Sequence, residues 1–397
     1  MFKQHPLFYF MKTLKKYYFV LGAAIFLKIV LFLYVNLTTP QSRFLVDSHD
    51  YLSTSQGIAE HKVFARVDPQ GNVNPEIYRT PGYPFFLAVL HRWLKIPLAG
   101  IVFIQILLTL AAAFLTYKTA IRIDPRLGFL SALIVLYDPP VTIFSLIILT
   151  EAVFLFLMAL FMYVFVRYLE NSQKRTLVMC ALVLVASVYV RPASYYLGIV
   201  PVFFVIWQAT RRREWKKMVV HASLFAVIVS GITGLWHYRN YSLFGQNTFS
   251  SINNATVGMH GLYKSYSRRV EKGEIPGTEN PVIYYSRLTT RSFLSLMTRP
   301  GSLKYFGPSK ILKYSGKLFA YPWMIFWMIG FFVGLVRFKK DRRFLFLMVV
   351  ILYFIGVTIV SITTQAYSRF RVPMVPFLAI VAAYGWVEVV VSQKRQN

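Results

Sequence analysis

Two aspartates near the start of the chain have the spacing of a paired acid site. Asp47 and Asp50 are three residues apart, which places both carboxylates on one face if the segment is helical. The small and apolar residues that follow at helical spacing (Tyr51, Leu52, Ser55, Ile58 and Ala59) predict an amphipathic helix at a membrane surface. The residue types alone favour a helix cap at Asp47, and a cap would also hold a catalytic carboxylate rigidly.

An arginine precedes a rigid turn further along the same segment. The residues Tyr78-Arg79-Thr80-Pro81-Gly82-Tyr83-Pro84 include two prolines and a glycine within four positions. They predict a tight turn at the entrance of a helix. Such turns are common, but the arginine before this one could present a fixed cation to a phosphate.

Other charged residues are expected at the ends of apolar runs. Glu151 follows Thr150 at the start of such a run, and an acid next to hydrocarbon is costly unless it is paired, protonated or in contact with water. A functional acid and a helix-start acid capped by Thr150 are equally good interpretations. Four arginines lie at comparable positions, where each could also bind lipid headgroups: Arg191, Arg239, Arg369 and Arg371.

The composition indicates that membrane-spanning helices position these residues. The 397 residues are 56% hydrophobic and only 15% charged, whereas soluble domains carry roughly 25% charged residues. This excludes an ordinary globular protein, a disordered chain and a disulfide scaffold, and the single cysteine excludes a Cys-based metal site. In so apolar a chain the net charge of +29 indicates contact with membrane lipids, and no nucleic acid partner is expected.

Apolar runs predict an all-α polytopic membrane protein with about ten transmembrane helices. A run of about 20 residues can cross a ~30 Å hydrocarbon layer. Asp138-Pro139-Pro140 and Arg191-Pro192 interrupt two of the longer stretches, because proline stops or kinks a helix. The predicted spans are 17–37, 97–121, 127–147, 149–168, 176–191, 195–209, 218–237, 318–337, 344–361 and 373–391.

Loop charges predict the orientation of these spans. The short loops placed inside carry 15 Lys and Arg, and the short loops placed outside carry three, so both termini are predicted to be cytoplasmic. Two long loops then fall outside. Residues 38–96 contain five of the 15 acids, and residues 238–317 contain 12 Lys and Arg against three Glu. We therefore divide the chain into a first membrane module (1–237), the basic loop (238–317) and a C-terminal membrane module (318–397).

Taken in order, these motifs resemble those of a known family. Asp-Ser-x-x-Tyr-Leu from Asp47, followed by Arg-x-Pro-Gly-Tyr-Pro from Arg79, is similar to the membrane glycosyltransferases of the GT-C superfamily. The likeness is greater to bacterial relatives of the family-39-type protein mannosyltransferases and aminoarabinose transferases. Segments 136–151, 239–245 and 369–385 agree in the same order, so the resemblance extends over about residues 45–385.

The resemblance implies an inverting enzyme that moves a sugar from a polyprenyl-phosphate carrier to the hydroxyl of a lipid, glycan or protein. The reaction would occur at the extracytoplasmic face of a bacterial inner membrane. The family's general base matches Asp47, with Asp50 in reserve. Glu151 matches an acid that supports the site or a metal, which leaves open a divalent ion held by Asp47 and Glu151. The donor-binding candidates are Arg79, Tyr51, Tyr83, Arg191, Arg239, Asn240, Arg369 and Arg371.

Two other classes of protein have to be compared with this one. A polytopic transporter or lipid flippase usually has internal repeats and matched helix breaks near the middle of the membrane. Here the unusual residues gather at the outer face and in two long outer loops. A purely structural membrane protein would give no reason for the acids of the first loop. The sequence therefore favours the glycosyltransferase, with the transporter or flippase as the alternative.

Overall fold

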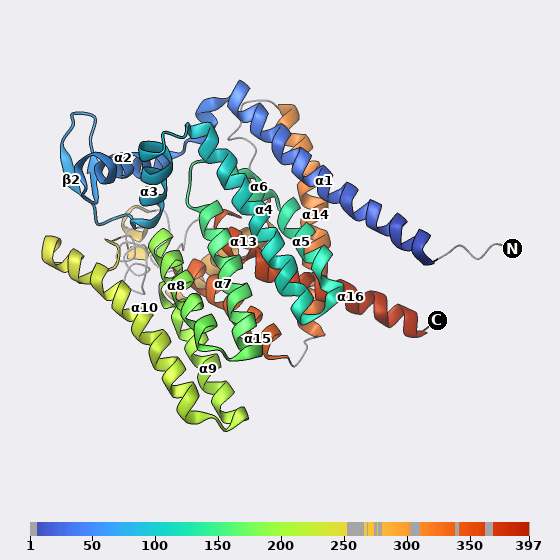
Figure 1. Cartoon of the computed structure of the whole chain (residues 1–397). Coiled ribbons are helices and arrows are strands. Elements are labelled where there is room, and N and C mark those ends of the chain that lie inside the picture. Colours follow the sequence, from blue (N-terminus) through green and yellow to red (C-terminus); the bar gives the residue numbers. More distant parts are fainter. Residues whose placement is uncertain are drawn as a thin grey trace.

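The computed structural model describes residues 6–251, 266–267, 269–273, 276, 280–301, 310–337, 341–361 and 368–396. It confirms an all-α polytopic fold (Figure 1). The main helices are α1 (Pro6–Thr38), α4 (Leu98–Ile123), α5 (Gly128–Tyr137), α6 (Pro139–Ser145), α7 (Glu151–Asn171), α8 (Lys174–Val190), α9 (Ile199–Arg212), α10 (Trp215–Phe244), α13 (Pro281–Thr298), α14 (Lys310–Val336), α15 (Arg342–Ser361) and α16 (Val375–Gln396).

The described residues contain eight helices that are long and apolar enough to cross a membrane. A ninth span is formed if α5 and α6, which are bent by 52° at Asp138, are counted together. The remaining expected span, 176–191, corresponds to α8, which has only 17 residues. The expected number of ten spans is therefore not confirmed, although a helix lies at each of the ten predicted positions.

Helices α7 and α16 form the centre of the bundle. In their most apolar windows 72% and 67% of the residues are buried inside the protein, against 17% for α1. Helix α7 packs against α4 and α8, and α16 packs against α14 and α5. Helix α1 runs along the edge of the bundle (Figure 1) and exposes Phe19 and Phe26, as expected for a span that faces lipid.

The segment between α1 and α4 folds into a small cap over one end of the bundle (Figure 1). Helix α2 (Val46–His61) confirms the predicted helix. It is followed by α3 (Gly82–Leu87) and a π-helical turn (Ala88–Trp93). An antiparallel hairpin that the sequence pattern did not predict is formed by β1 (Ala65–Val67) and β2 (Val73–Pro75), in which Ala65 pairs with Pro75. Strands of three residues carry too little alternation to be recognised.

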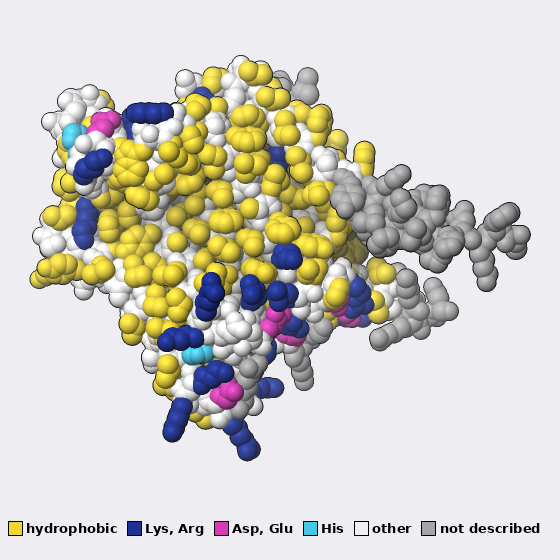
Figure 2. All heavy atoms as spheres, viewed as in Figure 1, with side chains coloured by type: hydrophobic (Ala, Val, Ile, Leu, Met, Phe, Trp, Pro, Cys, Tyr) yellow, Lys and Arg dark blue, Asp and Glu magenta, His cyan; other side chains and the backbone are white. Residues whose placement is uncertain are grey.

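The opposite end of the bundle is rich in basic side chains. Figure 2 shows a broad hydrophobic face with Lys and Arg gathered below it, where Figure 1 places the turn between α9 and α10. The turn between α9 and α10, which is one of the basic short loops of the sequence, therefore lies at the end of the bundle away from the cap. The cap and the basic turn lie at opposite ends of the helices that connect them.

Candidate active site

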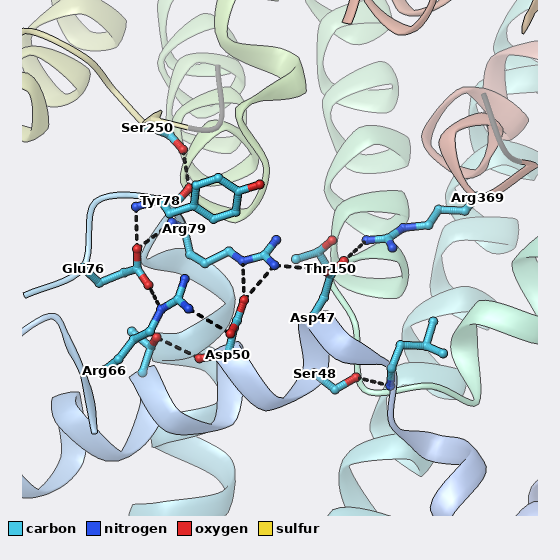
Figure 3. Close-up of polar contacts among 12 residues, drawn as sticks. Asp47, Ser48, Asp50, Arg66, Glu76, Tyr78, Arg79, Thr150, Ser250 and Arg369 are labelled. Carbon is cyan, nitrogen blue, oxygen red and sulfur yellow. Dashed lines mark hydrogen bonds and ion pairs between the residues drawn. The ribbon is translucent and has the colours of Figure 1, made fainter. Parts of the chain in front are cut away.

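Asp47 lies in the first turn of α2 and binds two arginines. Its Oδ1 accepts a hydrogen bond from Arg79 Nη2 at 2.7 Å, and its Oδ2 accepts one from Arg369 Nη2 at 2.8 Å (Figure 3). The cap interpretation of Asp47 is wrong, because the N-cap residue of α2 is Leu45. Both carboxylate oxygens face guanidinium groups, and 23% of the side chain remains accessible.

Arg79 joins Asp47 to Asp50. Its Nη2 lies 2.8 Å from Asp50 Oδ2, to which its Nε also donates at 3.2 Å. The guanidinium lies over the rings of Tyr51 and Tyr78, 5.2 and 5.0 Å from their centroids. Two carboxylates and two aromatic faces thus hold one cation in a fixed position.

The position of Arg79 depends on a buried acid that the sequence analysis did not select. Glu76 is 3% exposed and accepts hydrogen bonds from the backbone N–H groups of Tyr78 and Arg79. Its other oxygen binds Arg66, which also donates to Asp50 at 2.9 Å. Glu76 was visible as one of five loop acids. Arg66 gave no sequence signal, because the unpredicted hairpin brings it to the site.

The proline–glycine turn holds Arg79 against the bundle. Thr80 Oγ1 donates to the carbonyl of Val190 at 3.2 Å. A Cβ on Gly82 would lie 2.7 Å from the carbonyl carbon of Tyr189, a distance that backbone atoms do not tolerate. Only glycine therefore allows the turn to pack this closely against the end of α8.

Glu151 forms the second half of the site. It is fully buried at the start of α7 and binds Arg191 Nη1 at 2.9 Å and Arg369 Nε at 2.5 Å. Thr150 is the N-cap residue of α7, but its side chain makes no capping hydrogen bond. Arg369 therefore bridges Glu151 of the bundle and Asp47 of the cap. It lies at the start of a 3-10 turn (Ser368–Met374) that leads into α16.

Three of the predicted site residues bind elsewhere. Arg239 donates to the carbonyls of Glu76 and Phe64, and Asn240 donates to those of Thr248 and Phe249. Arg239 thereby fastens the cap to the end of α10, and Asn240 fastens the segment that follows α10 to the same helix end. Arg371 is fully buried and donates to the carbonyls of Leu296 and Met297 at the end of α13. The structure does not bring these three side chains to Asp47.

Tyr51 and Tyr83 lie beside and behind the acid site. Their rings meet edge to face, with centroids 5.0 Å apart. The hydroxyl of Tyr83 donates to Gln105 Oε1 at 2.7 Å, and Gln105 in turn binds the carbonyl of Ile147. Tyr83 therefore connects the cap to α4 and to the segment before α7.

The charges of the site balance, and they favour an ionised Asp47. Four carboxylates (Asp47, Asp50, Glu76 and Glu151) pair with four arginines (Arg66, Arg79, Arg191 and Arg369). Burial raises the pKa of Asp47, but the charges of Arg369 and Arg79 outweigh it and hold this pKa below its ordinary value. Burial raises the pKa of the Tyr51 hydroxyl, which therefore stays neutral.

The arrangement of the acids does not fit a metal held by Asp47 and Glu151. The two carboxylates face the same guanidinium, that of Arg369. Among the described residues, no three His, Cys, Asp or Glu side chains gather in a way that could hold a metal ion. The cation that lies between the two acids is the guanidinium of Arg369.

Several solved membrane enzymes are similar to this chain. The structure of ArnT from Cupriavidus metallidurans bound to undecaprenyl phosphate matches with a TM-score of 0.56 and 16% identity, covering 93% of this chain. The oligosaccharyltransferase of Archaeoglobus fulgidus with Zn and sulfate matches with a TM-score of 0.53 and 15% identity, again over 93% of this chain. The chain has a GT-C fold.

The sequence match and the structural matches each cover only part of a chain. Residues 78–237 of this GT-C chain match the sequence profile of the dolichyl-phosphate-mannose-protein mannosyltransferase family. The chain covers 62% of the length of ArnT and 49% of that of the oligosaccharyltransferase. No curated protein sequence matches it. The matched profile starts at Tyr78, so it includes Arg79, Glu151 and Arg191 but not Asp47.

Proposed function

We propose that this GT-C protein is an inverting glycosyltransferase that uses a polyprenyl-phosphate sugar as donor. The observation that carries the proposal is the bridge of Arg369 between Asp47 and Glu151, with Arg79 on the other oxygen of Asp47. It places an ionised, partly accessible carboxylate among cations at one end of a membrane bundle. A solved structure with the same fold, ArnT, is bound to undecaprenyl phosphate.

In the proposed reaction, Asp47 is the general base. A lone pair of the acceptor oxygen attacks the anomeric carbon of the donor from the face opposite the phosphate, and the bond between that carbon and the phosphate oxygen breaks. The proton of the acceptor hydroxyl passes to Asp47, and polyprenyl phosphate leaves with the bonding electron pair. Attack from the opposite face inverts the anomeric configuration. A positioned base typically contributes a factor of 10²–10⁴ to such a step.

Arg79 and Arg369 would stabilise the leaving phosphate. Both guanidinium groups already bind carboxylates with short, charge-assisted hydrogen bonds, and a phosphate offers oxygens of the same kind. A donor phosphate could therefore displace one carboxylate contact of each arginine and leave an oxygen of Asp47 free for the acceptor. Glu151 and Asp50 would hold the two arginines through this exchange.

The location of the reaction is part of the proposal. The basic turn between α9 and α10 lies at the end opposite the cap (Figures 1 and 2), which supports an extracytoplasmic cap and cytoplasmic termini in a bacterial inner membrane. The acceptor would be the hydroxyl of a lipid, a glycan or a protein. Arg191 would act through Glu151, and Arg239, Asn240 and Arg371 would hold the elements around the site.

The proposal is tested with purified protein, a panel of polyprenyl-phosphate sugars and mass analysis of the products. We expect one donor to yield free polyprenyl phosphate together with an acceptor heavier by one sugar. In proteoliposomes, movement of the intact donor across the bilayer without cleavage of the sugar–phosphate bond would show a transporter or flippase instead. Protein-free liposomes are the control for spontaneous hydrolysis.

A further inference from the structure

A polar cavity lies at the end of the bundle opposite the Asp47 site. It has a volume of about 620 Å³ and lies between the end of α7, the end of α9 and the start of α15. Glu151 begins α7 and Glu170 lies in its last turn. At 1.5 Å per residue their backbones are on the order of 30 Å apart. The cavity is therefore separate from the proposed catalytic site.

The acids that line this cavity are already paired. Glu170 accepts hydrogen bonds from Arg122 at 2.6 Å and from Arg343 at 3.1 Å. Arg343 also binds Asp341 at 2.7 Å. Within the described residues Arg211 has no carboxylate partner, and its guanidinium lies over the ring of Trp207, 5.3 Å from the centroid. The cavity thus offers a cation on an aromatic face to an anionic ligand.

The cavity also contains a buried acceptor that needs a donor. The side chain of Gln208 is only 4% exposed. Its Nε2 donates to Ser172 Oγ at 2.6 Å, but its Oε1 is buried without a hydrogen-bond partner. Buried acceptors of this kind are rare, because the lost hydration is not replaced. A ligand hydroxyl that donates to Oε1 would satisfy it.

An apolar helix face leads from the cavity along the bundle. Ile199, Phe203 and Ile206 of α9 are 67%, 55% and 43% exposed, and the ring of Phe203 stacks on that of Trp207. These residues lie within a predicted membrane span that ends at Arg211. The surface next to the cavity would therefore contact acyl chains, and Trp207, close to the end of this span, would lie near the headgroups.

We infer that this cavity binds an anionic phospholipid whose headgroup carries a hydroxyl, phosphatidylglycerol being the simplest. The phosphate binds Arg211, a glycerol hydroxyl donates to Gln208 Oε1, and the acyl chains lie along the exposed face of α9. Basic pockets between helices at a cytoplasmic membrane surface commonly take anionic headgroups. This inference rests on the proposed cytoplasmic position of this end of the bundle, but not on the proposed sugar transfer.

The test is a binding titration of the delipidated full chain in detergent, followed by native mass spectrometry. The probes are short-chain phosphatidylglycerol, phosphatidylcholine and glycerol 3-phosphate. We expect phosphatidylglycerol to bind most tightly, and Arg211→Ala to weaken it by about five-fold, the effect of one surface arginine. Lys216→Ala, an exposed lysine outside the cavity, should leave binding unchanged. Equal binding of phosphatidylcholine, or of glycerol 3-phosphate, overturns the assignment to an anionic lipid.

The role of Gln208 is tested with phosphatidylmethanol, which has the same charge as phosphatidylglycerol but no headgroup hydroxyl. The wild-type protein should prefer phosphatidylglycerol. Gln208→Met keeps the side-chain volume but removes the acceptor, so the two lipids should then bind equally. A melting temperature close to that of the wild type shows that the variant is folded. If the wild type binds both lipids equally, the proposed hydrogen bond from the headgroup hydroxyl to Gln208 Oε1 is wrong.

Discussion

At the scale of single residues, Arg369 connects the two parts of the site. It binds Asp47 of the cap at 2.8 Å and the buried Glu151 of the bundle at 2.5 Å. Glu151 has no access to water, and a buried carboxylate is costly unless cations compensate for its lost hydration. Arg369 provides this compensation together with Arg191, and at the same time it faces the accessible carboxylate of Asp47.

Replacement of Arg369 by alanine should strongly reduce catalytic efficiency. The variant loses the cation proposed to stabilise the leaving phosphate, an effect that typically reaches about 10²-fold or more. Steady-state transfer kinetics with the identified donor measure the change in kcat/KM. Arg92→Ala, which removes a distant arginine with a 3.7 Å contact to Glu60, is the matched control. Equal efficiency of the two variants would argue that Arg369 has only a structural role.

The pKa of Asp47 predicts the acid side of the pH profile. Burial raises this pKa, but the charges of Arg369 and Arg79 hold it below the ordinary value of an aspartate. A base must be ionised, so transfer should be lost only as the pH falls through the lowered pKa. The free energy that the ion pairs of Asp47 with Arg79 and Arg369 contribute to folding is lost in the same pH range, because protonation of Asp47 removes its charge. Arg79→Gln removes one of the cations, which raises the pKa and moves the acid limb of kcat/KM to higher pH. If the acid limb of the kcat/KM profile lies at the same pH in Arg79→Gln as in the wild type, the charge of Arg79 does not lower the pKa of Asp47.

Residue types and spacing were enough to find part of the site. Asp47, Asp50, Arg79, Glu151, Arg191 and Arg369 were all selected from the sequence and lie in one network. Arg371 is only two residues from Arg369, yet its side chain turns into the core toward α13. The direction of an arginine next to a helix end depends on its neighbours in space, which one sequence does not reveal. The catalytic roles remain predictions.

At the scale of the elements, α14 and α16 pack with their backbones close together. A Cβ on Gly385 would lie 1.9 Å from the carbonyl oxygen of Gly330 and 2.6 Å from the backbone nitrogen of Gly334. Small residues let helix backbones approach this closely in membranes, where packing rather than water drives association. The contact fixes α16, and the turn that carries Arg369 leads directly into α16.

Alanine at Gly385 should therefore separate α14 from α16. We expect Gly385→Ala to lower the melting temperature in detergent by several degrees, because overpacking typically costs about 1–3 kcal/mol. In Gly356→Ala, the new Cβ would meet nothing within 4 Å, so the better helix former should leave stability unchanged or slightly higher. Equal melting temperatures of the two variants would show that the α14–α16 contact is looser than the structure has it.

The helices were easier to predict than the cap. Long apolar runs determine the spans because the hydrocarbon layer demands them. The cap has no such requirement, and its hairpin depends on local contacts: Asp68 Oδ1 accepts from the backbone N–H groups of Gln70 and Asn72, and Gly71 adopts a φ of +87°. Residues 252–265, in the predicted basic loop, lie outside the described part of the chain.

At the scale of the whole molecule, the orientation in the membrane can be measured by labelling. Cys180 is buried, so Cys180→Ala provides a cysteine-free background. Gln70→Cys at the tip of the hairpin and Gln173→Cys between α7 and α8 are both exposed. In intact cells an impermeant maleimide should label position 70, and position 173 only after permeabilisation. The reverse pattern would place the cap in the cytoplasm and contradict the proposed side of the reaction.

The central claim is that Asp47 removes the proton from the acceptor. The most direct measurement is the kcat of sugar transfer in Asp47→Asn and, as a matched control, Asp50→Asn, which lies one turn away and shares Arg79. We predict a loss of at least about 10²-fold for Asp47→Asn, the usual contribution of a general base, and a much smaller loss for Asp50→Asn. A kcat for Asp47→Asn within a few-fold of the wild type would contradict the account.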